Sequence, residues 1–111
     1  MEYLLLMAEV PDAPPADPSE SGAPTAWLDE MLPRDVLRYG DRLRPKAEAR
    51  TVRIRDGKAL WTHGPYAEVQ EQVAGFDVIE AADLDEAIEI AAKHPCARSS
   101  AVEIRPLWNQ T

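Results

Sequence analysis

The chain has 111 residues, a hydrophobic fraction of 45% and a formal net charge of −8. This length predicts one domain over residues 1–111, and the acidic balance argues against nucleic-acid binding, because a phosphate-binding surface needs basic residues. Neither a run of about 20 apolar residues nor a basic leader is present, so no membrane span and no signal peptide are expected. The single cysteine, Cys96, fits a cytoplasmic protein.

The first third of the chain predicts a strand, a loop and a short helix. The strand covers residues 2–8, and its alternate side chains are apolar in both directions, which is typical of a central strand covered on both faces. Residues 9–25 hold five prolines among small and acidic residues and predict a mobile loop. A helix is expected over residues 26–32, and Pro33 ends it.

The middle of the chain predicts a connection over residues 41–50 and then a β-hairpin over residues 51–62. Asp56-Gly57 supplies the two residues with positive φ that a type I′ turn requires. The register set by this turn gives one apolar and one basic face, the pattern of a half-buried hairpin with a solvated basic side. The apolar face holds Val52, Ile54, Ala59 and Trp61, and the basic face holds Arg53, Arg55 and Lys58.

The last third predicts a strand over residues 73–80, a helix, and a final strand over residues 100–106. Asp83 and Glu86 have the spacing of a helix capping box, and Pro95 is expected to end the helix that they begin. The predicted buried stripe of this helix consists of Leu84, Ala87, Ile88, Ala91 and Ala92.

The element order β-α-β-β-β-α-β predicts an α+β, ferredoxin-like fold with an extended β-hairpin. Two helices can cover only one face of such a sheet. The first strand and the hairpin nevertheless leave apolar side chains for the second face. A second copy related by a two-fold axis is the simplest cover, so we predict a homodimer through the sheet face.

One long motif carries a family resemblance. From Thr51 to Phe76 the chain reads T-V-R-I-R-D-G-K-A-L-W-T-H-G-P-Y-A-E-V-Q-E-Q-V-A-G-F. This run resembles the YCII-related family, in particular the branch named for a D-G-P-F motif, whose usual string is close to R-D-G-x-x-x-x-T-D-G-P-F-A-E-T-K-E-Q-x-x-G-F/Y. The resemblance reaches over the chain except about residues 9–25, and it implies a single YCII-related domain that assembles as a dimeric α/β barrel.

Three of the departures from the family motif concern the candidate site. At residues 63–66 it reads H-G-P-Y, so His63 replaces the Asp of the motif and Tyr66 replaces its Phe. The Lys of T-K-E is Gln70, whereas Glu71 is retained. Three explanations are open: the reaction differs from that of relatives, His63 has taken over proton transfer, or the site only binds a ligand.

The predicted site residues surround this motif. Histidine titrates near neutral pH, so a carboxylate partner would let His63 act as a general base. We therefore predict His63 and Glu71 as catalytic residues. The alternative interpretation is structural, with His63 in a surface turn and Glu71 as a hydrogen-bond acceptor. The predicted substrate-binding residues are Arg42, Arg44, Arg53, Tyr66 and Glu68.

Basic residues concentrate in residues 34–55. This segment has eight basic against three acidic residues, a net charge of +5, which leaves −13 for the remainder. The cluster indicates either salt bridges within and between subunits or the attraction of an anionic small molecule. The chain has two histidines and no glycine-rich nucleotide motif, so neither a metal nor a cofactor is expected.

Three functions are open at this point. The first is a cofactor-free enzyme, like those the resemblance implies, that performs proton transfer or elimination on a small polar or anionic organic molecule. The second is a non-catalytic ligand-binding or regulatory accessory protein, because D-G-P-F relatives are often linked to alternative sigma factors. The third is a dimeric assembly module without a small-molecule site.

Overall fold

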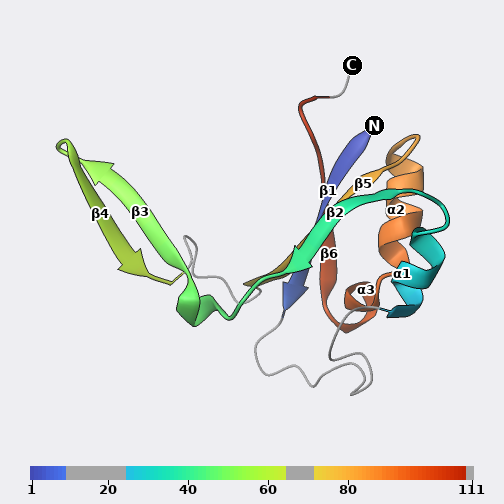
Figure 1. Cartoon of the computed structure of the whole chain (residues 1–111), viewed down its shortest axis with the longest axis horizontal. Coiled ribbons are helices and arrows are strands. Elements are labelled where there is room, and N and C mark those ends of the chain that lie inside the picture. Colours follow the sequence, from blue (N-terminus) through green and yellow to red (C-terminus); the bar gives the residue numbers. More distant parts are fainter. Residues whose placement is uncertain (10–24, 65–71, 110–111) are drawn as a thin grey trace.

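The computed structural model describes residues 1–9, 25–64 and 72–109 (Figure 1). The proline-rich segment predicted as a mobile loop therefore lies, for residues 10–24, outside the described residues. In chain order the elements are β1 (Glu2–Glu9), α1 (Thr25–Met31), β2 (Leu37–Arg42), the 3-10 turn η2 (Lys46–Glu48), β3 (Arg50–Arg55), β4 (Lys58–His63), β5 (Gln72–Glu80), α2 (Leu84–Ala92), α3 (Pro95–Ser99) and β6 (Ala101–Pro106).

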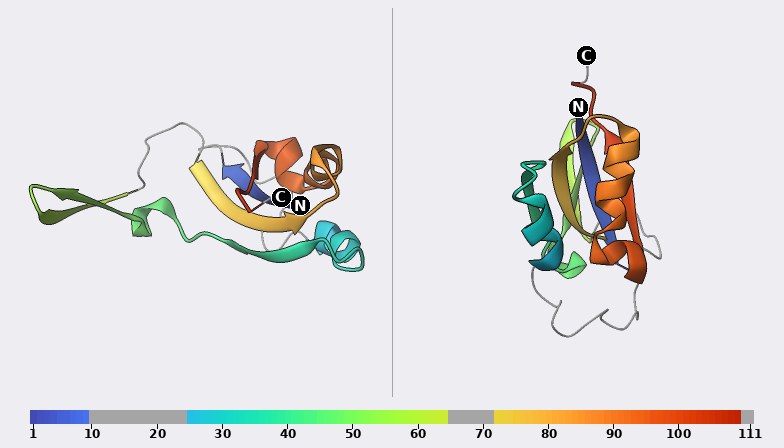
Figure 2. Two further views of the ribbon diagram at one scale, coloured as in Figure 1. Left: turned by 90° about the horizontal axis from the view of Figure 1, so that it is seen from above. Right: turned by 90° about the vertical axis from the view of Figure 1, so that its right-hand side faces the viewer.

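Four strands form an antiparallel sheet in the order β2-β5-β1-β6. The helices lie on one side of this sheet, to its right in Figure 1 and in front of it in the right-hand view of Figure 2. An antiparallel sheet with its helices on one face is an α+β architecture. The strand order is consistent with the predicted ferredoxin-like fold.

Strand β2 is not among the predicted elements: no element is expected over residues 34–40, and residues 41–50 are interpreted as a connection. β2 lies at the edge of the sheet and pairs with β5 alone, and most of its side chains are exposed. A register shift between Leu37 and Tyr39 also breaks its two-residue period. The short helix α3 is missed as well: Pro95 does not only end α2 but occupies the first turn of α3, where a missing N–H costs nothing.

The predicted hairpin forms, but it does not join the main sheet. β3 and β4 make a separate two-stranded sheet in the predicted register, with Val52 opposite Trp61. Asp56 and Gly57 have φ values of 53° and 76°, as the type I′ turn requires. Within the single chain the hairpin is exposed rather than half-buried: all of β4 is exposed and Trp61 retains 61% of its accessible surface. The hairpin instead projects away from the helices as an arm (Figure 1).

The core lies between the sheet and the helices. The indole Nε1 of Trp27 donates to the carbonyl oxygen of Ile90 at 3.0 Å and joins α1 to α2. The predicted stripe of α2 is correct at Ala87 and Ala91 but wrong at Leu84, Ile88 and Ala92, which are exposed. The helix is rotated so that Ile90 faces the sheet. The central core residues are Tyr3, Leu5, Met7, Trp27, Met31, Ile79, Ala87, Ile90 and Ala91.

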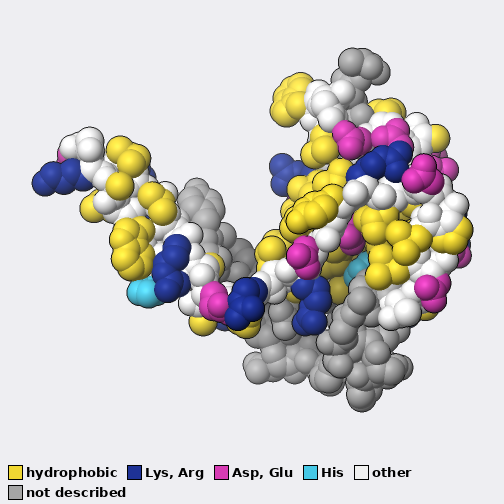
Figure 3. Space-filling model, viewed as in Figure 1, with side chains coloured by type: hydrophobic (Ala, Val, Ile, Leu, Met, Phe, Trp, Pro, Cys, Tyr) yellow, Lys and Arg dark blue, Asp and Glu magenta, His cyan; other side chains and the backbone are white. Residues whose placement is uncertain are grey.

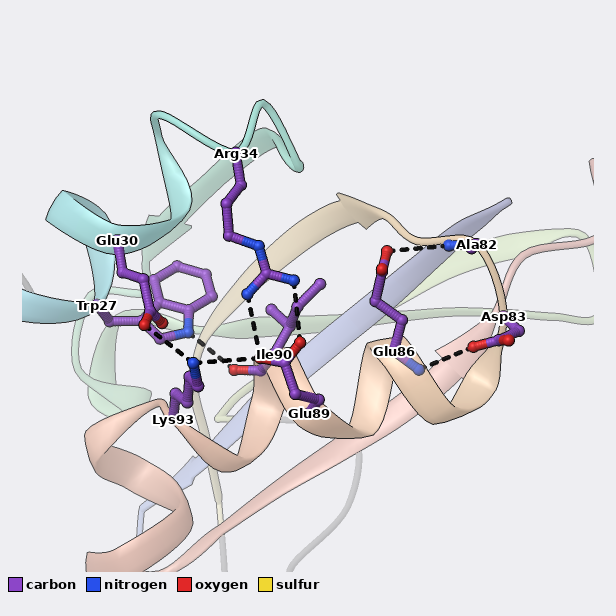
Figure 4. Close-up of polar contacts among 9 residues, drawn as sticks. All are labelled: Trp27, Glu30, Arg34, Ala82, Asp83, Glu86, Glu89, Ile90 and Lys93. Carbon is purple, nitrogen blue, oxygen red and sulfur yellow. Dashed lines mark hydrogen bonds and ion pairs between the residues drawn. The ribbon is translucent and has the colours of Figure 1, made fainter.

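Polar contacts on the outside of the helices add to this packing (Figure 4). The Arg34 guanidinium donates to both carboxylate oxygens of Glu89 at 3.0 Å, and Lys93 reaches Glu30 at 2.9 Å. Asp83 caps α2 by accepting from the Glu86 N–H at 2.9 Å, so the predicted capping box begins at the expected residue. Arg34, which belongs to the basic segment 34–55, therefore forms a salt bridge within the chain. No helix within the described residues is long and apolar enough to cross a bilayer.

Candidate functional site

His63, the base predicted from the sequence, lies at the end of β4 on the projecting hairpin. Its side chain is exposed, and its ring meets the Trp61 ring edge-on with centroids 5.3 Å apart. The neighbours predicted to complete this site, Tyr66, Glu68 and Glu71, lie outside the described residues. The pairing of His63 with Glu71 thus stays a prediction.

The predicted anion-binding arginines come from three different segments. Arg42 ends β2, and Arg53 is a partly buried residue of β3, opposite Leu60. Arg44 lies in the connection between β2 and η2, where its Nε donates to a carboxylate oxygen of Glu48 at 2.8 Å. Arg44 is therefore engaged in an ion pair with a residue four positions along the chain.

Asp77 in β5 carries a buried carboxyl and is not among the site residues predicted from the sequence. Asp77 is two residues before the fully buried Ile79, so both side chains point into the layer between sheet and helices. Only 9% of Asp77 is exposed. Burial raises the pKa of its carboxyl from 3.8 to about 6, since the charged form loses hydration. Among the described residues, no hydrogen bond or ion pair reaches this carboxyl.

Gly40 makes the space that Asp77 occupies. The two residues are paired across β2 and β5. A Cβ atom on Gly40 would lie 1.8 Å from the Oδ1 atom of Asp77 and 2.6 Å from the carbonyl oxygen of Phe76. The Asp77 carboxyl therefore rests over a stretch of β2 backbone that has no side chain.

The second buried polar side chain of the described part is His94, between α2 and α3. Its Nδ1 accepts from the backbone N–H of Cys96 at 3.1 Å and caps α3, so the neutral ring carries its proton on Nε2. The ring packs edge-on against Trp27, with centroids 5.1 Å apart. Burial lowers the pKa of His94 from 6.5 to about 4, so the imidazole is neutral near pH 7.

The helix-covered layer thus contains a carboxyl that titrates near pH 6, a neutral imidazole and the indole of Trp27, all among apolar side chains. Within the described ranges, no group of three or more His, Cys, Asp or Glu side chains has an arrangement that could hold a metal ion.

Comparisons with known proteins find a relative that is similar in sequence. "Uncharacterized protein R00369" of Rhizobium meliloti (strain 1021) is 41% identical over 68 residues, which cover 60% of this chain and 55% of that relative. The chain thus spans about half the length of this relative.

A solved structure with a similar fold is 5-chloro-2-hydroxyhydroquinone dehydrochlorinase (TftG) from Burkholderia phenoliruptrix AC1100, in complex with 2,5-dihydroxybenzoquinone. Its TM-score is 0.57 at 14% identity, with 99% of this chain and 96% of that chain covered, a likeness that concerns the fold alone. The family model of the YCII-related domain matches residues 1–111. The chain belongs to the YCII-related domain family.

Proposed function

We propose that the chain is a small-molecule enzyme that catalyses proton transfer or elimination without a cofactor, with Asp77 as its general base. The observation that carries this proposal is the buried Asp77 carboxyl, whose pKa of about 6 is close to neutral pH. A general base is most effective when its pKa lies near the working pH. Burying an ionisable carboxyl disfavours its charged form, and carboxyls with pKa values raised by burial are concentrated at functional sites.

The surroundings of Asp77 support this role. Desolvation is the cause of its raised pKa, and no charged side chain contributes to that shift. A cation at this place would lower the pKa of Asp77 and weaken it as a base. The apolar side chains around it exclude water, which strengthens electrostatic interactions with a bound molecule.

Elimination is the reaction that we favour. The solved structure of similar fold is named a dehydrochlorinase, and dehydrochlorination removes HCl from an organic molecule. In such a step a base takes a proton from the substrate, and the electron pair left behind expels chloride. Asp77, ionised above about pH 6, would accept that proton.

Chloride release tests this proposal. 5-Chloro-2-hydroxyhydroquinone and related chlorinated hydroquinones are the first probes, offered to the wild-type chain, Asp77→Asn and the control Asp29→Asn, which removes an exposed carboxylate from α1. We expect Asp77→Asn to lower the rate about 100-fold or more, as is usual for loss of a general base. The control should stay within about 2-fold, since Asp29 lies outside the buried layer. The wild-type rate should rise with pH through about 6.

Two results would contradict the proposal. If Asp77→Asn keeps full activity and His63→Ala loses it, the base is His63, with Glu71 as its predicted partner. If no probe is turned over but ligands shift the thermal unfolding temperature, the chain is a non-catalytic ligand-binding or regulatory accessory protein.

A further inference from the structure

The carboxyl of Asp77 leans toward one edge of the main sheet. β2 is the strand at this edge, since it pairs with β5 alone, and its residue Gly40 lies opposite Asp77. The position that a Cβ atom of Gly40 would take is 1.8 Å from Oδ1 of Asp77, so this oxygen lies over the backbone of the edge strand. A single strand therefore separates the carboxyl from the edge of the sheet, and at Gly40 that strand has no side chain.

Arg42 is the next residue of β2 on the same side of the sheet. Side chains two residues apart on a strand share a face, so Arg42 points to the side where Asp77 lies. Arg42 pairs with Gly75, and no register shift interrupts the two strands between this pair and that of Gly40 with Asp77. Arg42 and Asp77 are thus diagonal neighbours, at about 7–8 Å in an ordinary antiparallel pair. Two glycines and two side chains of opposite charge alternate on this face.

These opposite charges do not neutralise each other. Arg42 is exposed at the edge, whereas Asp77 is buried, and no ion pair joins the two among the described residues. Burial is the cause of the raised pKa of Asp77, to which Arg42 does not contribute. In Figure 3, basic, acidic and histidine side chains gather between the end of β2 and the helices. A cation and a carboxylate held apart in this way can bind two different parts of one molecule.

We propose that the substrate is a small organic anion of about the size of one ring, which enters at the β2 edge, places its anionic group on Arg42 and presents its acidic C–H to Asp77. A guanidinium binds a carboxylate with two parallel hydrogen bonds, which also fixes the orientation of the bound molecule. The diagonal of about 7–8 Å sets the distance between its two ends. This inference rests on the proposed role of Asp77 as the base and adds the class of substrate.

2,5-Dihydroxybenzoate and its methyl ester test the anion site without any turnover. The two share one ring, and the first alone has a carboxylate, which stays ionised between about pH 5 and 7. In titration calorimetry at pH 7 the wild-type chain should prefer the acid. Arg42→Gln should weaken binding of the acid about 10- to 100-fold, as loss of a hydrogen bond to a charged group does, and leave the ester within about 2-fold.

The matched control is Arg105→Gln. Arg105 is an exposed arginine of β6, at the opposite edge of the same sheet. This variant should bind the acid and the ester as the wild type does.

The pH dependence of the affinity reports whether the bound anion lies beside Asp77. A carboxylate near Asp77 disfavours its charge, so the acid should bind more tightly as Asp77 is protonated below about pH 6. We expect the affinity to rise about 3- to 10-fold from pH 7 to 5, which corresponds to about half to one pKa unit in Asp77. Asp77→Asn should remove this dependence and bind the acid at pH 7 as tightly as the wild type does at pH 5.

The other polar groups on this side of the sheet do not produce the same dependence. Leu5 faces Asp77 from β1, and Tyr3 follows on the same face of that strand. Asp77 and His94 are the two buried polar or charged side chains of the described part. Burial lowers the pKa of His94 to about 4, so it stays neutral from pH 5 to 7. Arg42 stays charged throughout this range.

Three binding results would overturn the inference. They are no binding of 2,5-dihydroxybenzoate at millimolar concentration, equal affinities for acid and ester in the wild type, and equal weakening of both by Arg42→Gln. An affinity for the acid that does not change with pH would separate the anion from Asp77 and overturn it as well.

Chloride release keeps this inference distinguishable from the proposed function. With a chlorinated hydroquinone that carries a carboxylate, Arg42→Gln should raise KM about 10-fold or more and leave kcat within about 3-fold, whereas Asp77→Asn lowers kcat. Binding that depends on Arg42 and on the titration of Asp77, without turnover, would refute the base and keep the anion site. Loss of turnover in Asp77→Asn with an unchanged KM in Arg42→Gln would keep the base and refute the anion site.

Discussion

At Asp77 and His94, one apolar layer shifts two pKa values in opposite directions. Burial disfavours the charged form of each group, which is the base form of a carboxyl and the acid form of an imidazole. The pKa of Asp77 therefore rises from 3.8 to about 6, and that of His94 falls from 6.5 to about 4. At neutral pH Asp77 is therefore charged, whereas His94 is neutral.

These shifts predict opposite contributions to the pH dependence of stability. Between about pH 4 and 6 the folded chain keeps the Asp77 proton that the unfolded chain releases, so this group makes the free energy of unfolding fall as pH rises. Between about pH 4 and 6.5 the unfolded chain protonates His94 while the folded chain does not, so this group makes the free energy of unfolding rise with pH. In the wild-type chain the two slopes oppose each other.

Single substitutions should reveal each slope. In urea unfolding at pH 4 to 7, the free energy of unfolding of Asp77→Asn should rise more steeply with pH than that of the wild type. Above pH 6 the free energy of unfolding of this variant should exceed that of the wild type by up to about 3 kcal/mol. His94→Asn keeps a side-chain acceptor at the N-cap of α3 and should change the slope in the other direction. Parallel curves for all three chains would contradict the burial of both groups.

At the scale of elements, the helix layer is joined by one buried hydrogen bond and a rim of ion pairs. The Trp27 indole reaches across to Ile90, whereas Arg34, Glu89 and Lys93 lie at the solvent edge. Exposed ion pairs contribute about 0–1 kcal/mol each, because water screens them and ordering long side chains costs entropy. The position of α1 on α2 therefore depends mainly on Trp27.

Trp27→Phe should separate these contributions. Phe keeps an aromatic ring in the core but leaves the Ile90 carbonyl oxygen without its donor, so we expect the free energy of unfolding to fall by about 1–3 kcal/mol. Trp108→Phe is the matched control, because Trp108 is fully exposed, and it should change stability by less than about 0.5 kcal/mol. Equal effects of the two substitutions in urea unfolding would contradict the role assigned to the indole.

At the scale of the whole molecule, the hairpin makes the single chain unusually extended. The Cα radius of gyration is 15.9 Å, with principal extents of 49, 40 and 19 Å. A compact domain of this length would have a radius of about 13 Å. The additional extent comes from the arm, whose apolar side chains Val52, Ile54 and Trp61 are exposed in the single chain.

Small-angle scattering can measure this shape in the monomer. The Val52→Glu/Ile54→Glu variant replaces two exposed apolar side chains of the arm by charged ones, which disfavours association through the arm. It should scatter as an extended particle with a radius of gyration near the 15.9 Å of the single chain. A compact value near about 13 Å would mean that the hairpin folds back onto its own sheet.

Local sequence signals were sufficient for the elements whose pattern is set by near neighbours. The Asp56-Gly57 turn determined the hairpin register, the Asp83 and Glu86 pair determined the start of α2, and the apolar run of residues 3–8 indicated a central strand. Turns and caps depend on backbone φ and on hydrogen bonds within a few residues, so a single sequence contains the information. The motif at residues 51–76 was likewise enough to recognise the YCII-related family.

Other features depended on contacts between distant segments. β2 is an edge strand held by β5, and its own residues show no clear two-residue period. In β5, Phe76 and Val78 alternate with Asp77, so the sequence pattern favours a solvent-facing carboxyl. The structure turns this strand the other way, because Ile79 packs under the helices and Gly40 leaves space above Asp77.

The sequence by itself thus determined the family, most of the helices and strands and the hairpin turn of this protein, because these follow from residues close together in the chain. The tertiary structure alone decided which face of each strand is covered, and therefore which carboxyl is buried and which apolar surfaces are left open. Desolvation depends on every segment that packs around a group, and residues 37–42 and 75–79, which surround Asp77, meet only in the folded chain.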